Sequence, residues 1–534
     1  MATSTRDLAR VGLRRGADPA TGLPHGIRRA YGVLASSVLG MLLLAVLGAS
    51  LGPRWDPQPL TDPIEVTSPS TAVAGAPQLH HYRTVSTVLT IHLAPDVDVQ
   101  ARLVEPLDAP GRVPGVVFVH GAGTGKFVDA FVVQAQRLAE AGIATLVPDK
   151  RLDTYSMQHR DYVAMAQDYA RSVAVLRDRP RVDPDHVGVY AESEGGWIAP
   201  VMAAADPSLA FLALISDPVV PPRQQAAFAM DNYLRNTGVP GGVFRAIPRA
   251  AGMSPSEGFE YVDFDVRPFL AQVHQPMFVA YGTADASMPV DQGAQLVLRT
   301  TPSRGITVRY YADADHGLKV DKAVSPRFVD DLAGWVLGLP KTAGAGPQVA
   351  GAEPSQLFLA APVPQPRWLA SGRLMLTIVV TGAALVLVPW VLASADRAWR
   401  AARVRRRGQR HPDLPVVRGP RWAPGIAWRL AGVGLGALAT SGALVWYLLA
   451  IARIAMDYQH NALIVQGGWL VVRVLGLWVV VAGALLGRRM LDVRASGRRV
   501  APGAARLVGT WASALGTVTL LVVLAYWGVF QLGI

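Results

Sequence analysis

The stretch VGVYAESEGGWI (residues 187–198) places a serine between a short apolar strand and a segment with the character of a helix. A strand-to-helix turn of this kind is so sharp that the residues two before and two after the serine must be small. Those residues are Ala191 and Gly195, so the pattern around Ser193 is A-x-S-x-G rather than G-x-S-x-G. Alanine is small enough for the turn, and the stretch therefore predicts that Ser193 is a nucleophile.

Its two expected partners follow later in the chain, each just past another apolar strand. PMFVAYG (276–282) ends shortly before Asp285, and ITVRYY (306–311) ends shortly before His316. Side chains that do chemistry on a parallel sheet lie on loops beyond the carboxyl ends of its strands. We expect His316 to take the proton of Ser193 and Asp285 to orient the histidine ring.

Other acids compete for the orienting role. Asp217 follows the strand FLALIS (211–216) and is the alternative source of the carboxylate. Asp313 and Asp315 are close to the histidine in sequence, but neighbours along one loop rarely point at the same ring.

A second glycine-containing turn is expected to bind the oxyanion. GVVFVHG (115–121) is typical of a buried strand that ends in a histidine-glycine turn. We expect the backbone N–H groups of Ala122 and Glu194 to stabilise a tetrahedral oxyanion there. His120 is expected to be structural. Glu192 and Glu194 are expected to be hydrogen-bonded within the serine turn, with recognition of a substrate amine as the alternative.

No cofactor or metal is predicted. HGAGTGKF (120–127) fails as a phosphate-binding loop, because His120 and Phe127 stand where that motif needs glycine and serine or threonine. The chain has no cysteine, which removes thiolate zinc sites and disulfides alike.

Between residues 81 and 338 the chain resembles α/β-hydrolases of the dienelactone-hydrolase and serine-aminopeptidase-like kind. The resemblance is carried by VPDKR (147–151), RVDPDHVGVYAESEGG (181–196) and FDVRPFLAQVHQPMFVAYGTADASMPV (264–290). It implies an α/β fold with a doubly wound, mostly parallel sheet. It also implies a serine hydrolase that cleaves an ester, thioester or amide through an acyl-enzyme intermediate. The substrate class stays open between small-molecule, lipid-like and peptide substrates.

The rest of the chain is strongly apolar, and hydrophobic residues make up 51% of the whole. Each of five apolar runs is near or above the ~20 residues that a membrane helix needs. These runs, expected to be transmembrane helices, are 30–52, 374–394, 430–452, 462–487 and 507–530.

Arginines flank these runs unevenly. Residues 1–29 contain six arginines, 395–426 contain nine and 488–506 contain six, whereas 453–461 contain one. Basic segments beside membrane helices stay in the cytoplasm. We therefore expect a cell-membrane protein with its N-terminus inside, and with its hydrolase domain and C-terminus outside.

The expected organisation follows the same divisions. Run 30–52 is a transmembrane helix or signal anchor, with a cleaved signal peptide as the alternative. The expected segments are a cytoplasmic tail (1–29), this helix (30–52), a linker (53–80), the hydrolase domain (81–338) with a cap near 218–260, a second linker (339–372) and four transmembrane helices with basic loops (373–534).

The net charge of +12 does not indicate nucleic-acid binding. Residues 53–372 hold 26 basic and 33 acidic residues, so the excess of cations belongs to the membrane-flanking segments and favours a lipid bilayer as partner.

Arg473 lies inside the run 462–487. It is expected to reach the membrane interface or to pair with Asp457, or else to mark a lipid-headgroup site. Abundant arginine, alanine and glycine favour a bacterial source. The rival function is a non-catalytic membrane protein whose hydrolase-like domain binds a ligand or partner.

Overall fold

The computed structural model describes residues 25–123, 125–156, 158–253, 260–408, 421–456 and 459–532. The chain divides into two compact units. One contains residues 53–238 and 247–366, and the other contains residues up to 52, residues 239–246 and residues from 367 onward. We call them the sheet unit and the helical unit.

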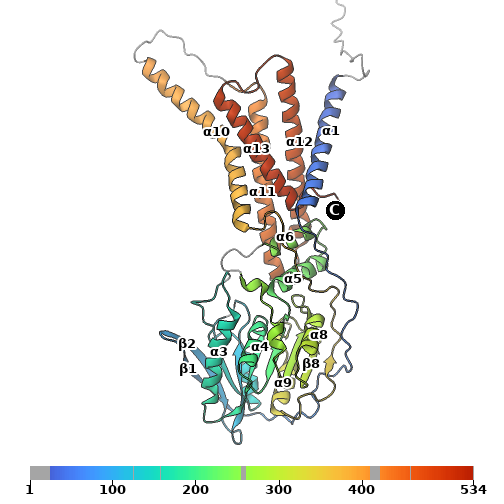
Figure 1. Cartoon of the computed structure of the whole chain (residues 1–534), viewed down its shortest axis with the longest axis vertical. Coiled ribbons are helices and arrows are strands. Elements are labelled where there is room, and N and C mark those ends of the chain that lie inside the picture. Colours follow the sequence, from blue (N-terminus) through green and yellow to red (C-terminus); the bar gives the residue numbers. More distant parts are fainter. Residues whose placement is uncertain are drawn as a thin grey trace, which may run out of the picture. The chain divides into compact units, whose positions relative to one another are not determined.

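A nine-stranded sheet, counted over the described residues, organises the sheet unit (Figure 1). Its order is β1-β2-β4-β3-β5-β6-β7-β8-β11, and only the β1–β2 and β2–β4 pairs are antiparallel. The strands are β1 (Thr84–Ala94), β2 (Val97–Pro106), β3 (Val113–Val119), β4 (Ala144–Pro148), β5 (Val182–Glu192), β6 (Leu212–Ile215), β7 (Met277–Gly282), β8 (Ile306–Tyr311) and β11 (Val349–Gly351). A separate hairpin joins β9 (Lys319–Val320) to β10 (Ala323–Val324).

Both faces of the sheet are buried. Along β3, Val117 and Val119 belong to one apolar core, while Val116 and Phe118 belong to the other, as the two-residue period of a strand requires. Helices α3 (Tyr162–Arg177), α4 (Gly195–Ala205) and α8 (Val290–Thr300) cover the first face, and α2 (Val132–Glu140) and α9 (Pro326–Leu337) cover the second. The prediction of a doubly wound, mostly parallel sheet is confirmed.

The helices of the sheet unit follow their strands as crossovers. They are α2 (Val132–Glu140), α3 (Tyr162–Arg177), α4 (Gly195–Ala205), α5 (Pro222–Asn236), α6 (Ala246–Ala251), η2 (Glu260–Asp263), α7 (Arg267–Leu270), α8 (Val290–Thr300) and α9 (Pro326–Leu337). α5, α6 and η2 occupy the segment in which we expected a cap. Within that segment, the short helix η1 (Val243–Arg245) is grouped with the helical unit, where a Cβ atom on Gly242 would lie 3.0 Å from the Trp469 ring.

The two expected linkers pack on the sheet unit rather than forming free spacers. In the first, the Ile64 N–H donates to both carboxylate oxygens of Asp291 at 3.1 Å, and the Thr67 N–H donates to Val349 O at 3.2 Å. The second linker contributes β11, which pairs in parallel with β8. A three-residue edge strand has too little periodicity to be predicted from sequence.

The helical unit contains five helices that are long and apolar enough to cross a membrane, counted over the residues described above (Figure 1). They are α1 (His25–Leu51), α10 (Gly372–Gly408), α11 (Ile426–Met456), α12 (Gly468–Ala495), which continues a π-helical turn at Leu463–Gly467, and α13 (Ala504–Tyr526). Each overlaps one of the five predicted runs, so the prediction of five long apolar helices is confirmed.

Small residues let these helices approach closely. A Cβ atom on Gly516 would lie 2.5 Å from the Gly382 carbonyl oxygen, and one on Gly48 would clash with the Ala525 backbone. In lipid there is no hydrophobic driving force between helices, and close packing of this kind is what lets them associate. Arg473 donates from Nη2 to Gln531 O at 2.7 Å, while Asp457, its predicted partner, lies outside the described residues.

Candidate active site

Ser193 occupies the turn between β5 and α4 with a φ of 56°, the left-handed region that a serine rarely adopts. A Cβ atom on Gly195 would lie 2.7 Å from Val119 O and 3.3 Å from the Ala191 Cβ. Glycine is therefore required at position 195, and the residue at 191 must stay small. The turn has the geometry that the A-x-S-x-G pattern predicts.

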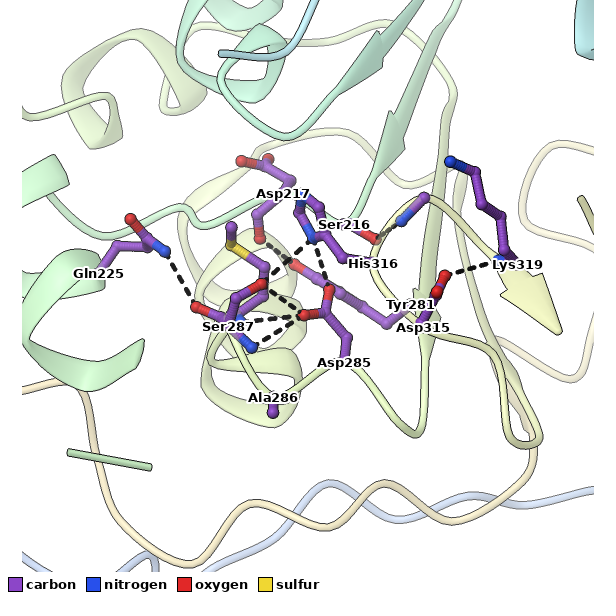
Figure 2. Close-up of polar contacts among 12 residues, drawn as sticks. Ser216, Asp217, Gln225, Tyr281, Asp285, Ala286, Ser287, Asp315, His316 and Lys319 are labelled. Carbon is purple, nitrogen blue, oxygen red and sulfur yellow. Dashed lines mark hydrogen bonds and ion pairs between the residues drawn. The ribbon is translucent and has the colours of Figure 1, made fainter. Parts of the chain in front are cut away.

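An acid–base pair lies on the loops after β7 and β8. His316 Nδ1 and Asp285 Oδ2 are 2.9 Å apart, and the Asp285 side chain is fully buried whereas 29% of the His316 side chain is exposed. The other Asp285 oxygen accepts hydrogen bonds from Ser287 Oγ at 2.7 Å and Ser287 N at 3.0 Å. Figure 2 shows the Asp285 carboxylate in contact with Ser287 through one oxygen and with the His316 ring through the other.

Mutual attraction favours the charged forms of both groups. Burial alone would raise the pKa of the Asp285 carboxyl, but His316 and the Ser287 donors outweigh burial and hold that pKa below its ordinary value. Burial alone would lower the pKa of His316, but the Asp285 carboxylate outweighs it and the pKa of the ring is raised. A positive charge on the His316 ring is therefore stabilised by the Asp285 carboxylate.

The histidine loop lies beside the serine turn. A Cβ atom on Gly317 would be 3.2 Å from Glu192 Oε1, and the Gly317 N–H reaches Ser216 Oγ, at the end of β6, at 3.5 Å. Glu192 also accepts a 2.9 Å hydrogen bond from Tyr190 OH, and burial raises the pKa of its carboxyl. Glu192 is thus held within the turn by a neighbouring side chain.

The competing acids face elsewhere. Asp217 is fully buried, and its Oδ1 accepts from the Val219 N–H at 3.1 Å. Within the described part of the chain its Oδ2 has no hydrogen-bond partner, and burial raises the pKa of this carboxyl to about 7. Asp315 accepts from the Lys319 N–H in its own loop. The structure brings Asp285, and neither of these acids, against His316 (Figure 2).

The predicted oxyanion turn lies against the serine. A Cβ atom on Gly121 would be 3.3 Å from Ser193 Cβ and 3.8 Å from its Oγ. Among the residues that the structure describes, no hydrogen bond runs from the N–H group of Ala122 or of Glu194 to another backbone group. His120 is buried, and its Nε2 donates to Pro148 O at 2.6 Å.

Burial lowers the pKa of His120 to about 4, so its ring is neutral at pH 7 and serves as a structural donor. The described residues also contain no group of three or more histidine, cysteine, aspartate or glutamate side chains arranged to hold a metal ion.

A buried ion cluster that sequence reasoning missed surrounds the side chain of Glu194. Its carboxylate accepts hydrogen bonds from Lys150 Nζ at 2.9 Å, Arg160 Nη1 at 2.6 Å and Tyr155 OH at 2.9 Å. Lys150 Nζ also donates to Gly121 O at 2.7 Å. One ammonium group therefore ties the serine turn to the oxyanion turn.

The partners in this cluster are almost completely removed from water. The side chains of Lys150 and Glu194 are each 1% exposed. Burial lowers the pKa of Lys150, and its attraction to Glu194 offsets part of that effect. A lysine directly after a buried strand, in VPDKR, was the available sequence signal, because a buried lysine needs an anionic partner.

The strand order and the left-handed turn between β5 and α4 are those of the α/β-hydrolase fold, as the sequence predicted. Residues 130–341 match the prolyl oligopeptidase family. No curated protein matches the chain.

Solved structures that resemble the chain include three bacterial or environmental proteins. A hypothetical protein of Pseudomonas aeruginosa is 15% identical, with a TM-score of 0.36, and the match covers 53% of this chain and 99% of that one. A dienelactone hydrolase from Anabaena variabilis is 19% identical (TM-score 0.32; 47% and 94% covered). A cold-adapted esterase from an Arctic intertidal metagenomic library is 14% identical (TM-score 0.32; 47% and 93% covered).

Replacing Lys150 by methionine should destabilise the protein and slow its reaction. The change removes one cation from a buried carboxylate and the donor from Gly121 O, which we expect to cost about 3 kcal/mol of unfolding free energy. Lys126→Met is the matched control, because the Lys126–Asp149 pair has a lysine side chain that is 61% exposed and should contribute under ~1 kcal/mol. Denaturant unfolding of the full-length proteins measures the loss of unfolding free energy in each of the two variants. Equal losses in Lys150→Met and Lys126→Met would contradict a special role for Lys150.

Replacing Asp285 by asparagine should lower the hydrolysis rate about 10³–10⁴-fold, because asparagine favours the wrong histidine tautomer. Asp217→Asn should change the rate less than tenfold. The base must be neutral to act, so wild-type activity should fall as pH drops through a midpoint above the ordinary histidine pKa, and Asp285→Asn should move that midpoint to lower pH. Rates on a p-nitrophenyl ester across pH test this; a larger loss in Asp217→Asn would transfer the role to Asp217.

Proposed function

We propose that the protein is a membrane-anchored serine hydrolase whose sheet unit lies outside the cytoplasm and cleaves an ester, thioester or amide. The fold and the family match support a hydrolase. The observation that carries the serine chemistry is the left-handed turn at Ser193, with the Asp285–His316 pair on the adjoining loops.

The proposed reaction begins when Ser193 attacks the acyl carbon and His316 accepts the hydroxyl proton. The N–H groups of Ala122 and Glu194 bind the developing oxyanion; losing one such donor typically costs ~2.7–4 kcal/mol of barrier stabilisation. His316 then passes the proton to the leaving group, and the acyl-enzyme forms. Water hydrolyses it with His316 acting as base again. Asp285 holds the ring and stabilises its positive charge throughout.

The cluster around Glu194 supports this mechanism. An unpaired carboxylate directly after the nucleophile would repel the oxyanion. Two cations, Lys150 and Arg160, lie against the Glu194 carboxylate and offset that repulsion.

The rival proposal is a hydrolase-like domain that binds a ligand without catalysis. Under it, Ser193 would have no activated hydroxyl. A fluorophosphonate probe separates the two proposals, because it labels only an activated serine.

Ser193→Ala should abolish both labelling and hydrolysis while leaving the unfolding temperature within a few degrees of wild type. The control is Ser208→Ala, because Ser208 is exposed and its hydroxyl donates to the Asp206 carboxylate at 2.5 Å rather than to a histidine. That variant should label fully. Full labelling of Ser193→Ala would overturn the assignment.

The membrane orientation is supported by where the arginine-rich segments meet. Arg506, at the start of α13, donates to Asp396, in the C-terminal part of α10, at 3.1 Å. The Ala423 N–H, just before α11, donates to Val500 O, just before α13, at 3.1 Å. The described residues that border these two basic segments therefore lie at one end of the helical unit, as the positive-inside rule requires if that end is cytoplasmic.

Alkaline phosphatase, which is active only after export, should be active when fused after Pro366 and after Ile534, and silent when fused after Arg406. Moving the arginines near Arg406 across the membrane would oppose the preference of basic segments for the cytoplasmic side. A fluorescent protein that matures only in the cytoplasm should give the reverse pattern. Phosphatase activity after Arg406 would place the hydrolase in the cytoplasm.

A further inference from the structure

The helical unit contains a cavity of about 910 Å³ that the serine chemistry does not use. Its walls come from the start of α1, the start of α11 and the last part of α12. Figure 1 shows the start of α1 and the end of α12 at the same end of this unit. It is the end at which the basic segments meet.

Arginines dominate the polar wall of this cavity. Arg29, Arg429, Arg488 and Arg489 line it against a single acid, Asp492. Arg488 Nε lies 3.4 Å from that acid. The cavity therefore carries more cations than its own carboxylate can neutralise.

Two of the guanidinium groups converge on Gly425. A Cβ atom on Gly425 would lie 2.6 Å from Arg429 Nη1 and 3.4 Å from Arg489 Nε. The groups are held there by carbonyl oxygens, Arg429 by Gly425 O at 2.9 Å and Arg489 by Pro424 O at 2.9 and 3.0 Å. Like charges held beside one another repel, and an anion between them would relieve the repulsion.

One arginine N–H group in this cavity lacks a hydrogen-bond acceptor. Arg429 Nε is buried, and within the described part of the chain it has no hydrogen-bond acceptor. The Arg429 guanidinium also lies over the Trp428 ring, 4.1 Å from its centroid, which fixes the plane of the group. A planar, oriented guanidinium is suited to a phosphate oxygen.

The remaining walls are apolar. Val33 and Leu34 on α1 face the cavity together with Val481 and Leu485 on α12. A cavity with cations at one side and hydrocarbon at the other matches a molecule with an anionic head and an acyl tail. Its volume is in the range of sites that hold small ligands.

We propose that this cavity binds an anionic membrane phospholipid, with the headgroup phosphate at Arg429 and Arg489 and an acyl chain against α1 and α12. Basic pockets between membrane helices on the cytoplasmic side are known to accept such headgroups. The proposal rests on the membrane placement of the helical unit and is independent of the serine chemistry. A lipid seated there bridges α1 to the rest of the helical unit.

The test compares two double variants of the purified full-length protein. Arg429→Gln with Arg489→Gln removes the paired guanidinium groups. Arg405→Gln with Arg406→Gln removes the same charge from the exposed end of α10, outside the cavity. Each protein is heated in neutral detergent with added phosphatidylglycerol, phosphatidylcholine or inorganic phosphate, and the unfolding temperature is recorded.

Phosphatidylglycerol should raise the unfolding temperature of wild type and of the Arg405/Arg406 variant by several degrees, and that of the Arg429/Arg489 variant by less than one third as much. Phosphatidylcholine and inorganic phosphate should have little effect on any of them. Equal responses of the two variants, or an equal effect of phosphatidylcholine, would overturn the site. If inorganic phosphate raised the unfolding temperature as much as phosphatidylglycerol does, the bound phosphate would not need to come from a lipid, and the lipid assignment would be overturned.

Two further measurements keep the test decisive. Fluorophosphonate labelling of Ser193 in both variants shows that the sheet unit is folded, and carbonate extraction of cell membranes tests membrane placement separately. If the double variant does not fold, Arg429→Lys replaces it, because it keeps the charge but loses the planar donor set. A lysine variant that responds fully to phosphatidylglycerol would overturn the role of Arg429.

Discussion

The left-handed turn at Ser193 is the constraint on which the rest of the active site depends. A serine in this backbone region costs of order 1–3 kcal/mol and persists only when its surroundings hold it there. The Ser193 N–H donates to Ile215 O at 2.9 Å, and the Gly196 N–H donates to Ser193 O at 2.9 Å. The adjacent strand and the first turn of α4 thus fix the conformation. Because the turn is so tight, Gly195 and Ala191 must be small, and the oxyanion turn can approach the nucleophile.

The same closeness creates an electrostatic difficulty that the buried cluster resolves. In the proposed mechanism Glu194 supplies its N–H to an anion, while its own carboxylate is nearby and shielded from water. Burial favours the protonated form of a carboxylate that has no cation beside it, as it does for Asp217. Lys150 and Arg160 instead keep Glu194 paired, and Lys150 extends the connection to Gly121. Catalytic geometry and buried charge are therefore maintained by one set of contacts.

Local patterns were sufficient to predict the strand ends that carry Ser193, Asp285 and His316, and the five apolar helices. These features depend on periodicity and on turn residues close together in sequence. The Lys150–Glu194 pair joins residues 44 positions apart, and nothing in either local pattern identifies the partner. β11 is too short to show a period, and its place in the sheet comes from its pairing with β8. Tertiary contacts decided these features.

The two units differ in net charge. Residues 53–372 are acidic on balance, whereas the arginines of the basic loops meet at one end of the helical unit. Orientation in a membrane requires only that those cations stay on one side, and exposed arginines such as Arg405 satisfy that requirement. It does not require a cavity, or two guanidinium groups converging on Gly425, or a buried Arg429 Nε without an acceptor. Since an unsatisfied buried donor lowers stability, these arginines are explained better by an anion that they bind than by orientation alone.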